Sequence, residues 1–308
     1  MQDDHFLLIK TSKELLNWRQ SIPSNDPNAK VDTVGIVPTM GNLHQGHLAL
    51  AKASFIENRF TIVTIFVNPK QFGPSEDWDR YPRTLTKDCE LLFEAWQDFQ
   101  KSQKLSNHSL IIFAPVAPQE IYPTGFNTQI IVNEISKLWE GEHRPGHFAG
   151  VTTVVYLLFQ LCKPHNAYFG LKDFQQFQVI HKMNHDLLLG INIIGHPIVR
   201  DADTLALSSR NQYLSEEGRT QAVHLPKTLQ KLKNLCLTSR SFDLLTLEIQ
   251  RLKSQDPKWE YLAYCDYETL LPLKKLQKKA ILLAVYLVEN TRLLDNQIIE
   301  LTELTHDR

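Results

Sequence analysis

The first two thirds of the chain alternate short apolar runs with longer segments of helical periodicity. The apolar runs have the composition of buried strands and cover residues 31–37, 61–67, 110–113, 167–169 and 191–199. Helical spacing of apolar side chains lies between them, at residues 46–58, 85–99, 151–162 and 173–189. This alternation predicts one sheet of parallel strands with helices on both faces. Ligands of such sheets bind at the carboxyl ends of the strands.

The pattern changes after about residue 200. Two amphipathic helices are predicted at residues 215–237 and 242–254, followed by strands at 261–266 and 280–287. This part reads as a smaller α+β domain. Eleven of the twelve glycines lie between Gly35 and Gly195. That distribution places the ligand chemistry in the first two thirds, although a more helical C-terminal third would give the same distribution.

Charge and cysteine content narrow the functional classes. Lys plus Arg total 33 and Asp plus Glu total 34, a net charge of −1, which gives no electrostatic basis for binding nucleic acid or an anionic membrane. No apolar run approaches the roughly 20 residues of a membrane span, and the N-terminal sequence does not resemble a signal peptide. The four cysteines form no CxxC pair, so neither zinc nor a disulfide framework is indicated. We expect a cytoplasmic globular protein.

The segment VPTMGNLHQGH, residues 37–47, follows the first predicted strand and leads into a helix. Gly41 lets the chain turn, and Gly46 lets the helix begin close to a bound group. His44 and His47 are three residues apart, so both rings can face one point beside the helix N-terminus, which favours anions. The pattern suits a phosphoanhydride. A turn with two surface histidines is the alternative, and zinc is disfavoured because no third ligand lies nearby.

Neutral amides follow the second strand in FVNPKQF, residues 66–72. Asn68 and Gln71 each carry donor and acceptor atoms, as a substrate with hydroxyl groups requires. For this segment alone, a polar turn is the favoured interpretation. Further along, EGEHRPGHFAGVTT (residues 140–153) gathers Arg144, histidines and three glycines before a buried helix. This composition is typical of a loop that covers a substrate, and equally of a loop that contacts no ligand.

Positive charge appears in YFGLKDFQQ, residues 168–176. Lys172 offers a point charge, and Asp173 can cap a helix while it accepts a bond from a ribose hydroxyl or orients a base. Gln176 lies one helical turn further on. The alternative is an ordinary helix cap beside a solvated lysine.

Hydroxyl groups and a guanidinium come together in LALSSRN, residues 205–211. Ser208, Ser209 and Arg210 suit the oxygens of phosphate groups. A Ser-rich turn before a helix is the alternative interpretation.

Together and in this order, PTMGNLHQGH, FVNPKQF, YPRT, HRPGHFAGV, YFGLKDFQQ and LALSSRNQYLS resemble the pantothenate synthetase (pantoate–β-alanine ligase) family. This family belongs to the H-x-G-H nucleotidyltransferase superfamily. The resemblance runs from residue 34 to 215, and thinly onward through RLLDN at 292–296. It implies a Rossmann-like α/β catalytic domain over residues 1–198. A smaller α+β domain over 199–308 would contribute the Ser-Ser-Arg phosphate loop.

The resemblance also implies the reaction and its partners. Pantoate and β-alanine would be joined with Mg²⁺-bound ATP to give pantothenate, AMP and pyrophosphate through a pantoyl-adenylate. No metal site belonging to the protein itself is expected, and a homodimer is implied. His47 would be a proton donor, and His44 would act with it on the α-phosphate and the departing pyrophosphate. The other implied catalytic residues are Lys172, Ser208, Ser209 and Arg210.

The implied binding residues form two sets. The ATP site comprises Met40, Gly41, Asn42, Leu43, His44, Gln45, Gly46, His47, Gly170, Leu171, Lys172, Asp173, Val199, Leu207, Ser208, Ser209 and Arg210. The pantoate and β-alanine site comprises Gln71, Gln176 and Asn68.

Some features depart from the usual family pattern or allow another interpretation. Thr204 stands where the family usually has glycine, and would be strained if its φ were positive. Residues 24–30 and 100–109 are polar and predicted as loops, and either residues 81–84 or 142–147 would cover the intermediate. A nucleotidyltransferase acting on a phosphorylated alcohol would share only the H-x-G-H and the phosphate loop. A non-enzymatic nucleotide-binding module would need neither Lys172 nor both histidines.

Overall fold

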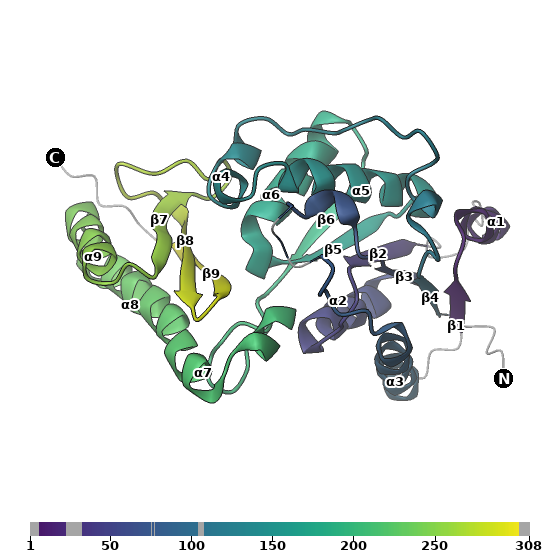
Figure 1. The fold of residues 1–308 in the computed structure, drawn as a ribbon, viewed down its shortest axis with the longest axis horizontal. Coiled ribbons are helices and arrows are strands. Elements are labelled where there is room, and N and C mark those ends of the chain that lie inside the picture. Colours follow the sequence, from purple (N-terminus) through teal and green to yellow (C-terminus); the bar gives the residue numbers. More distant parts are fainter. Residues whose placement is uncertain (1–5, 23–32, 75, 77, 104–107, 302–308) are drawn as a thin grey trace.

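A parallel sheet of six strands forms the larger part of the molecule in the computed structural model, which describes residues 6–22, 33–74, 76, 78–103 and 108–301 (Figure 1). The spatial order is β1-β4-β3-β2-β5-β6, and every neighbouring pair is parallel. The strands are β1 (Phe6–Ile9), β2 (Val34–Thr39), β3 (Phe60–Ile65), β4 (Ser109–Phe113), β5 (Asn166–Gly170) and β6 (Asn192–His196). The predicted doubly covered parallel sheet is confirmed.

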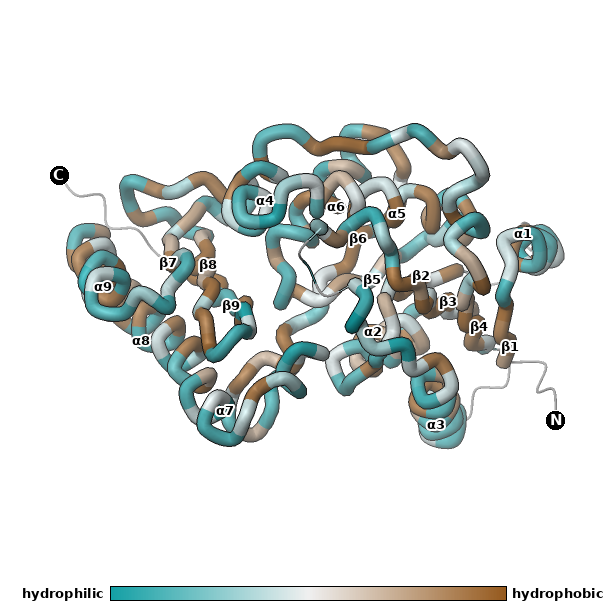
Figure 2. The backbone as a smooth tube through the Cα atoms, viewed as in Figure 1, coloured by the Kyte–Doolittle hydropathy of each residue, from teal (hydrophilic) through white to brown (hydrophobic). Residues whose placement is uncertain are grey.

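Helices cover both faces of this sheet. On one face lie α1 (Ser12–Ser21), α5 (His147–Cys162) and α6 (Phe174–Asp186); on the other lie α2 (Gln45–Glu57) and α3 (Leu85–Gln103) (Figure 1). The sheet strands between them are predominantly apolar (Figure 2). A short helix, α4 (Glu140–His143), stands beside the C-terminal part. Across the described residues, no helix combines the length and apolarity that crossing a bilayer requires.

The strand order reverses direction between β2 and β5. From β2 the chain steps outward through β3 to β4, and later returns to place β5 and then β6 on the other side of β2. Loops that leave β2 and β5 therefore run to opposite sides and open a crevice at the carboxyl ends of these strands, where ligands of such sheets bind. The predicted histidine and lysine segments are the loops that leave these two strands.

An antiparallel sheet of three strands follows, made of β7 (Trp259–Asp266), β8 (Lys279–Val288) and β9 (Thr291–Glu300). Its helices are α7 (Glu216–Ala222), α8 (His224–Ser239) and α9 (Phe242–Gln255). Alternate residues of β8 enter different cores: Leu283 packs with the core of the parallel sheet, and Leu282 packs with the core under α8. The central strand is thus apolar on both faces, and the small sheet is wedged between its own helices and the larger part.

The structure departs from the predicted elements at several places. β1, α1 and β9 were not expected from the sequence. The helix predicted over residues 215–237 breaks at Val223, because Pro226 has no N–H to donate to the carbonyl of Ala222. α3 continues to Gln103, so the predicted loop at 100–109 is helical in its first four residues. The predicted loop at 24–30 lies outside the described residues.

Candidate active site

A cavity of about 260 Å³ opens at the crevice between β2 and β5. Its walls come from the loops after β2, β3, β5 and β6, from the start of α5 and α6, and from the segment before α7. Most of the predicted site residues line it: Met40, His44, Gly46, His47, Asn68, Gln71, Gly170, Lys172, Asp173, Gln176, Val199, Leu207, Ser208, Ser209 and Arg210. Five segments that are distant in sequence thus meet at one place.

The remaining predicted residues, Gly41, Asn42, Leu43, Gln45 and Leu171, do not line this cavity. The side chain of Leu43 packs into the core beneath α2 and α3, and Leu171 packs against the core of the parallel sheet. Asn42 contributes through its backbone, because its carbonyl accepts a hydrogen bond from Oγ of Ser209 at 3.3 Å. That bond joins the histidine loop to the Ser-Ser-Arg segment.

The two histidines are held at the N-terminus of α2. His44 is the N-cap residue, and its Nδ1 accepts from the N–H of Gly46 at 3.1 Å. Nδ1 of His47 accepts from the N–H of His44 at 3.3 Å. Because each Nδ1 is an acceptor, the proton of each neutral ring belongs on Nε2. Burial and nearby positive groups lower the pKa of His44 to about 4 and that of His47 to about 3, so both rings are neutral at pH 7.

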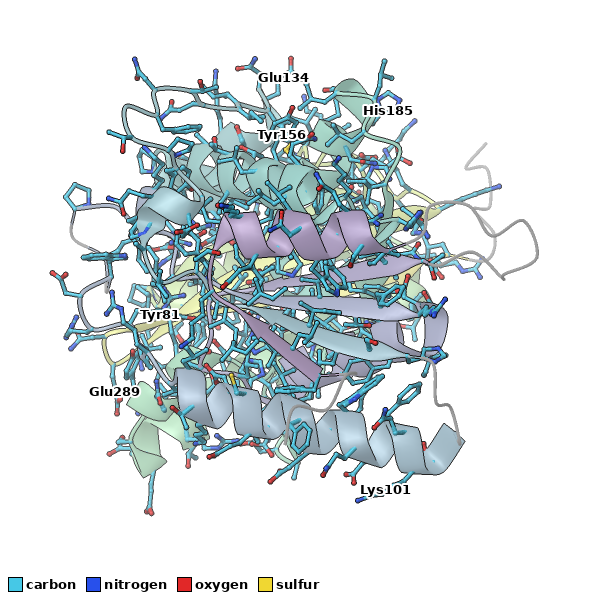
Figure 3. All side chains as sticks on the ribbon, turned by 90° about the vertical axis from the view of Figure 1, so that its right-hand side faces the viewer. Tyr81, Lys101, Glu134, Tyr156, His185 and Glu289 are labelled. Carbon is cyan, nitrogen blue, oxygen red and sulfur yellow. The ribbon has the colours of Figure 1, made fainter. Side chains whose placement is uncertain are left out.

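Asp88 of α3 clamps the histidine loop, a role that was not predicted from the sequence. The loop passes through two left-handed residues, Gly41 (φ +82) and Asn42 (φ +50). The buried carboxylate of Asp88 accepts from the N–H groups of Asn42 at 3.0 Å and Leu43 at 2.8 Å, and from the hydroxyl of Thr84. Figure 3 shows Tyr81 beyond one end of α3 and Lys101 near the other, so the N-terminal end of this helix approaches the site.

A signal for Asp88 does exist in the sequence. Leu92, Trp96 and Phe99 form the buried stripe of α3, and Asp88 continues that stripe one turn earlier. An acid on the apolar face of an amphipathic helix needs polar partners, because a buried charge without them is costly.

The amide side of the cavity is a hydrogen-bonded cluster. The side-chain amide of Asn68 donates to Oε1 of Gln71 at 3.0 Å and to the carbonyl of Gly150 at 3.2 Å, and its Oδ1 accepts from the hydroxyl of Tyr122 at 2.7 Å. Gln71 in turn donates to Sδ of Met40 at 3.0 Å. The side-chain amide of Asn68 therefore forms its hydrogen bonds with protein groups, and one of these bonds orients Gln71.

Gly150 permits this arrangement. A Cβ at this position would lie 2.2 Å from the carbonyl oxygen of Lys70 and 2.7 Å from Cα of Gln71. Only glycine lets α5 approach the turn that carries the two amides this closely.

The RPGH segment lies against the same cluster. Nε2 of His147 accepts from Arg144 at 3.1 Å, so its Nδ1 donates to the carbonyl of Gln71 at 2.8 Å. Burial and Arg144 lower the pKa of His147 to about 4. Arg144 also forms a two-pronged ion pair with Glu76, at 2.8 and 2.6 Å. This pair joins the segment after η1 (Pro69–Gln71) to the segment before α5.

The positive side of the cavity is formed by the turn η4 (Leu171–Asp173) and by the segment that contains η5 (Ser209–Tyr213). Nζ of Lys172 lies 3.1 Å from Oδ1 of Asp173. A second cavity of about 450 Å³, toward the C-terminal sheet, shares Arg144, Lys172, Asp173, Ser208 and Arg210 with the first. The cationic side chains thus stand where the two cavities adjoin.

Thr204 has a φ of +75, the conformation for which glycine is suited. It lies in a turn between Arg200 and Ala206, which form a β-bridge, and Arg200 donates to its carbonyl. The strain expected for threonine at this position is therefore present in the fold.

These features define the class of the protein: an α/β protein whose parallel sheet, covered by helices on both faces, carries an H-x-G-H segment at its ligand crevice. In the described part of the chain, no three His, Cys, Asp or Glu side chains gather as metal ligands. The model of the family described as "Pantoate-beta-alanine ligase" matches residues 7–298. The chain therefore belongs to the pantoate–β-alanine ligase family and is an enzyme of that family, as the motif order predicted.

Individual relatives agree with this assignment. The pantothenate synthetase of Thermotoga petrophila is 42% identical over 297 residues, covering 95% of this chain and 99% of its own. That of Moorella thermoacetica is 42% identical over 274 residues, covering 88% and 92%. The crystal structure of pantothenate synthetase from Thermus thermophilus has a TM-score of 0.82 at 39% identity and covers 94% and 98%. A pantoate-beta-alanine ligase from Francisella tularensis, "complexed with Beta-gamma ATP and Beta-alanine", has a TM-score of 0.72 at 30% identity and covers 95% and 97%.

Proposed function

We propose that this enzyme condenses (R)-pantoate with β-alanine through a pantoyl-adenylate intermediate, releasing pyrophosphate and then AMP. The observation that carries the proposal is the composition of one cavity. The neutral histidines, Lys172 and the amides of Gln71 and Gln176 all line it. The Francisella relative, complexed with Beta-gamma ATP and Beta-alanine, supports the choice of substrates.

The chemistry explains why an adenylate is needed. A carboxylate does not react with an amine at neutral pH, because an oxide is too poor a leaving group. When a pantoate carboxylate oxygen attacks the α-phosphorus of ATP, pyrophosphate leaves and a mixed anhydride forms. The amine of β-alanine then attacks the acyl carbon, and AMP departs with the bridging oxygen. The first step brings two anions together, so hydrogen-bond donors and cations must be in place before the reaction.

We assign the phosphate contacts to the positive side of the cavity. Lys172, Ser208, Ser209 and Arg210 would bind the phosphate oxygens, and the α2 N-terminus would favour the negative charge. His44 and His47 would each donate a hydrogen bond from Nε2. Since the pKa of His47 is about 3, we assign it hydrogen-bond donation as a neutral ring in place of the expected transfer of a proton.

The rest of the ATP site is assigned by position. The backbone at Val199 would lie near adenine, and the wall from Gly170 to Asp173 would contact the nucleotide. Mg²⁺ bound to ATP would neutralise part of the triphosphate charge. The shared wall of the two cavities, where the cationic side chains stand, supports a triphosphate in this place.

Gln71 and Gln176 would hold the hydroxyl groups of pantoate, and Gln71 would also border β-alanine. Asn68 has a different role in this proposal from that expected. Because its amide is bonded to Gln71, Gly150 and Tyr122, it positions Gln71 instead of binding substrate.

The adenylate must be kept from water. Both segments expected to cover it border the first cavity, through Tyr81 and through Arg144 with His147. The ion pair between Arg144 and Glu76 ties the second segment to the stretch of chain just before the first, so we propose that the two segments cover the site together. The division at residue 198 and the homodimer rest on the resemblance, and the cytoplasmic location rests on the composition of the chain. Light scattering tests the homodimer.

Oxygen labelling tests the proposed route. Pantoate labelled with ¹⁸O in its carboxylate is incubated with ATP, Mg²⁺ and β-alanine, and the products are examined by mass spectrometry. We expect one label in AMP and none in pyrophosphate, because the carboxylate oxygen leaves with AMP. Label in inorganic phosphate together with ADP would instead show an acyl phosphate and would overturn the proposal.

A further inference from the structure

Asn296 of the C-terminal sheet reaches into the larger part of the molecule. Its side-chain amide donates to the carbonyl of Leu171 at 2.8 Å and to that of Lys172 at 2.9 Å. Asn296 is only 3% exposed. One buried amide from β9 therefore holds two consecutive carbonyl groups of η4, the turn that presents Lys172 to the cavity.

The strand that carries Asn296 is itself fixed at this point. The neighbouring Asp295, 1% exposed, accepts the N–H of Asn296 at 2.8 Å and binds Arg200 in a two-pronged ion pair at 2.7 and 2.9 Å. Arg200 begins the turn that leads to Ser208. Two adjacent side chains of β9 thus hold the two segments that supply the positive side of the cavity.

We propose that Asn296 is a positioning residue for adenylation, acting through Lys172. The inference rests on the proposed function, in which Lys172 meets the phosphate charge that develops in the first step. Without the amide, the half-buried carbonyl groups of Leu171 and Lys172 lose this donor, and the turn shifts to find another. A displacement of about 1 Å at a group that stabilises charge lowers a rate by as much as about 100-fold.

The half-reactions are measured separately to test this. Pantoate-dependent exchange of labelled pyrophosphate into ATP reports adenylation, and supplied pantoyl-adenylate with β-alanine reports the second step. In Asn296→Ala we expect exchange to fall by about 10- to 100-fold at saturating ATP. The second step and the KM for ATP should stay within about 3-fold of wild type, because Lys172 acts on the departing pyrophosphate.

Two further variants distinguish an effect on the position of Lys172 from a general disturbance of the fold. Gln297→Ala removes the next amide on β9, whose Oε1 accepts only a long bond from Lys233 at 3.5 Å, and should leave exchange unchanged. The double variant Lys172→Ala/Asn296→Ala should be no slower than Lys172→Ala, since a residue that acts through Lys172 adds nothing once the lysine is gone. If Asn296→Ala does not fold, Asn296→Ser replaces it throughout.

The outcomes are distinct. Additive losses in the double variant, or an equal fall of both half-reactions, would overturn the role of Asn296. Unchanged exchange in a folded Asn296 variant would do the same. Absence of pantoate-dependent exchange in the wild-type enzyme would instead overturn the proposed function itself, and the role of Asn296 with it.

Discussion

The rings of His44 and His47 lie with their centroids 4.1 Å apart and their planes inclined by 35°, and the backbone N–H of His44 donates to Nδ1 of His47. This bond fixes the second ring by the backbone of the first residue. Both side chains therefore depend on the same turn at the start of α2, and both present Nε2 as a donor. The pair is set in place before any substrate binds.

Removal of His47 should slow adenylation strongly. A preorganised donor to a developing charge contributes about 10²- to 10³-fold in rate, so we expect His47→Ala to lose pantoate-dependent pyrophosphate release by that factor. His185→Ala, at an exposed histidine of α6, is the matched control. Wild-type rates in a folded His47→Ala enzyme would remove this residue from the mechanism.

Neutralising Asp88, which does not line the cavity, should disturb the histidine loop. Asn offers one acceptor oxygen where the carboxylate offers two, so one of the N–H groups of Asn42 and Leu43 loses its partner. An unsatisfied buried group costs about 1–3 kcal/mol, and we expect Asp88→Asn to lower kcat/KM for ATP by about 10-fold or more. Steady-state kinetics measure the effect beside Asp98→Asn, an exposed acid on the same helix. Equal kinetics in both variants would show that the clamp is dispensable.

Glycine at position 204 should stabilise the protein. Threonine at φ +75 carries backbone strain that glycine does not, and we expect Thr204→Gly to raise the free energy of unfolding by about 1 kcal/mol, net of the greater chain entropy of glycine. Thr204→Ala, which keeps a Cβ, should gain less. Urea unfolding compares the three proteins. A less stable Thr204→Gly would show that the threonine side chain contributes more than its strain costs.

The buried histidines should make stability depend on pH. The pKa values of His44, His47 and His147 fall to about 4, 3 and 4 in the fold, against about 6.5 in the unfolded chain. Below pH 6.5 the unfolded chain binds protons that the fold does not. The free energy of unfolding therefore falls as pH drops towards 4, by about 1.4 kcal/mol per pH unit for each histidine, and above pH 6.5 these groups contribute no slope.

Denaturant unfolding at pH 7, 6 and 5 checks this slope. His47→Gln should show a shallower decline than wild type, because one titrating group is gone. Identical slopes would mean that His47 titrates normally in the folded enzyme.

The inner strands of the parallel sheet could be predicted because strands buried on both faces read as continuous apolar runs. β1 is a four-residue edge strand, and Leu8 on it is 41% exposed, so it lacks that signal. β9 buries Asp295 and Asn296 among its apolar residues, which interrupts the pattern of a strand. The histidine, glutamine and serine segments of the candidate site could be proposed from the sequence because each motif is contained in a short stretch of chain.

The partners of residues that bond to distant backbone could not be found in this way. Asp88 bonds a loop 46 positions away, and Asn296 bonds a turn 124 positions away. A sequence motif does not encode such a partner, because the fold alone brings the two segments together. The sequence alone could say only that Thr204 would be strained if its φ were positive. In the structure its φ is +75.

The most direct test of the account is pyrophosphate release from ATP and Mg²⁺ with pantoate alone, followed by addition of β-alanine. We expect a burst of roughly one equivalent per site with pantoate, and steady turnover only after β-alanine is added, as for a bound intermediate that waits for its acceptor. Release that requires both acids from the start, or that proceeds without pantoate, would contradict a separate adenylation step.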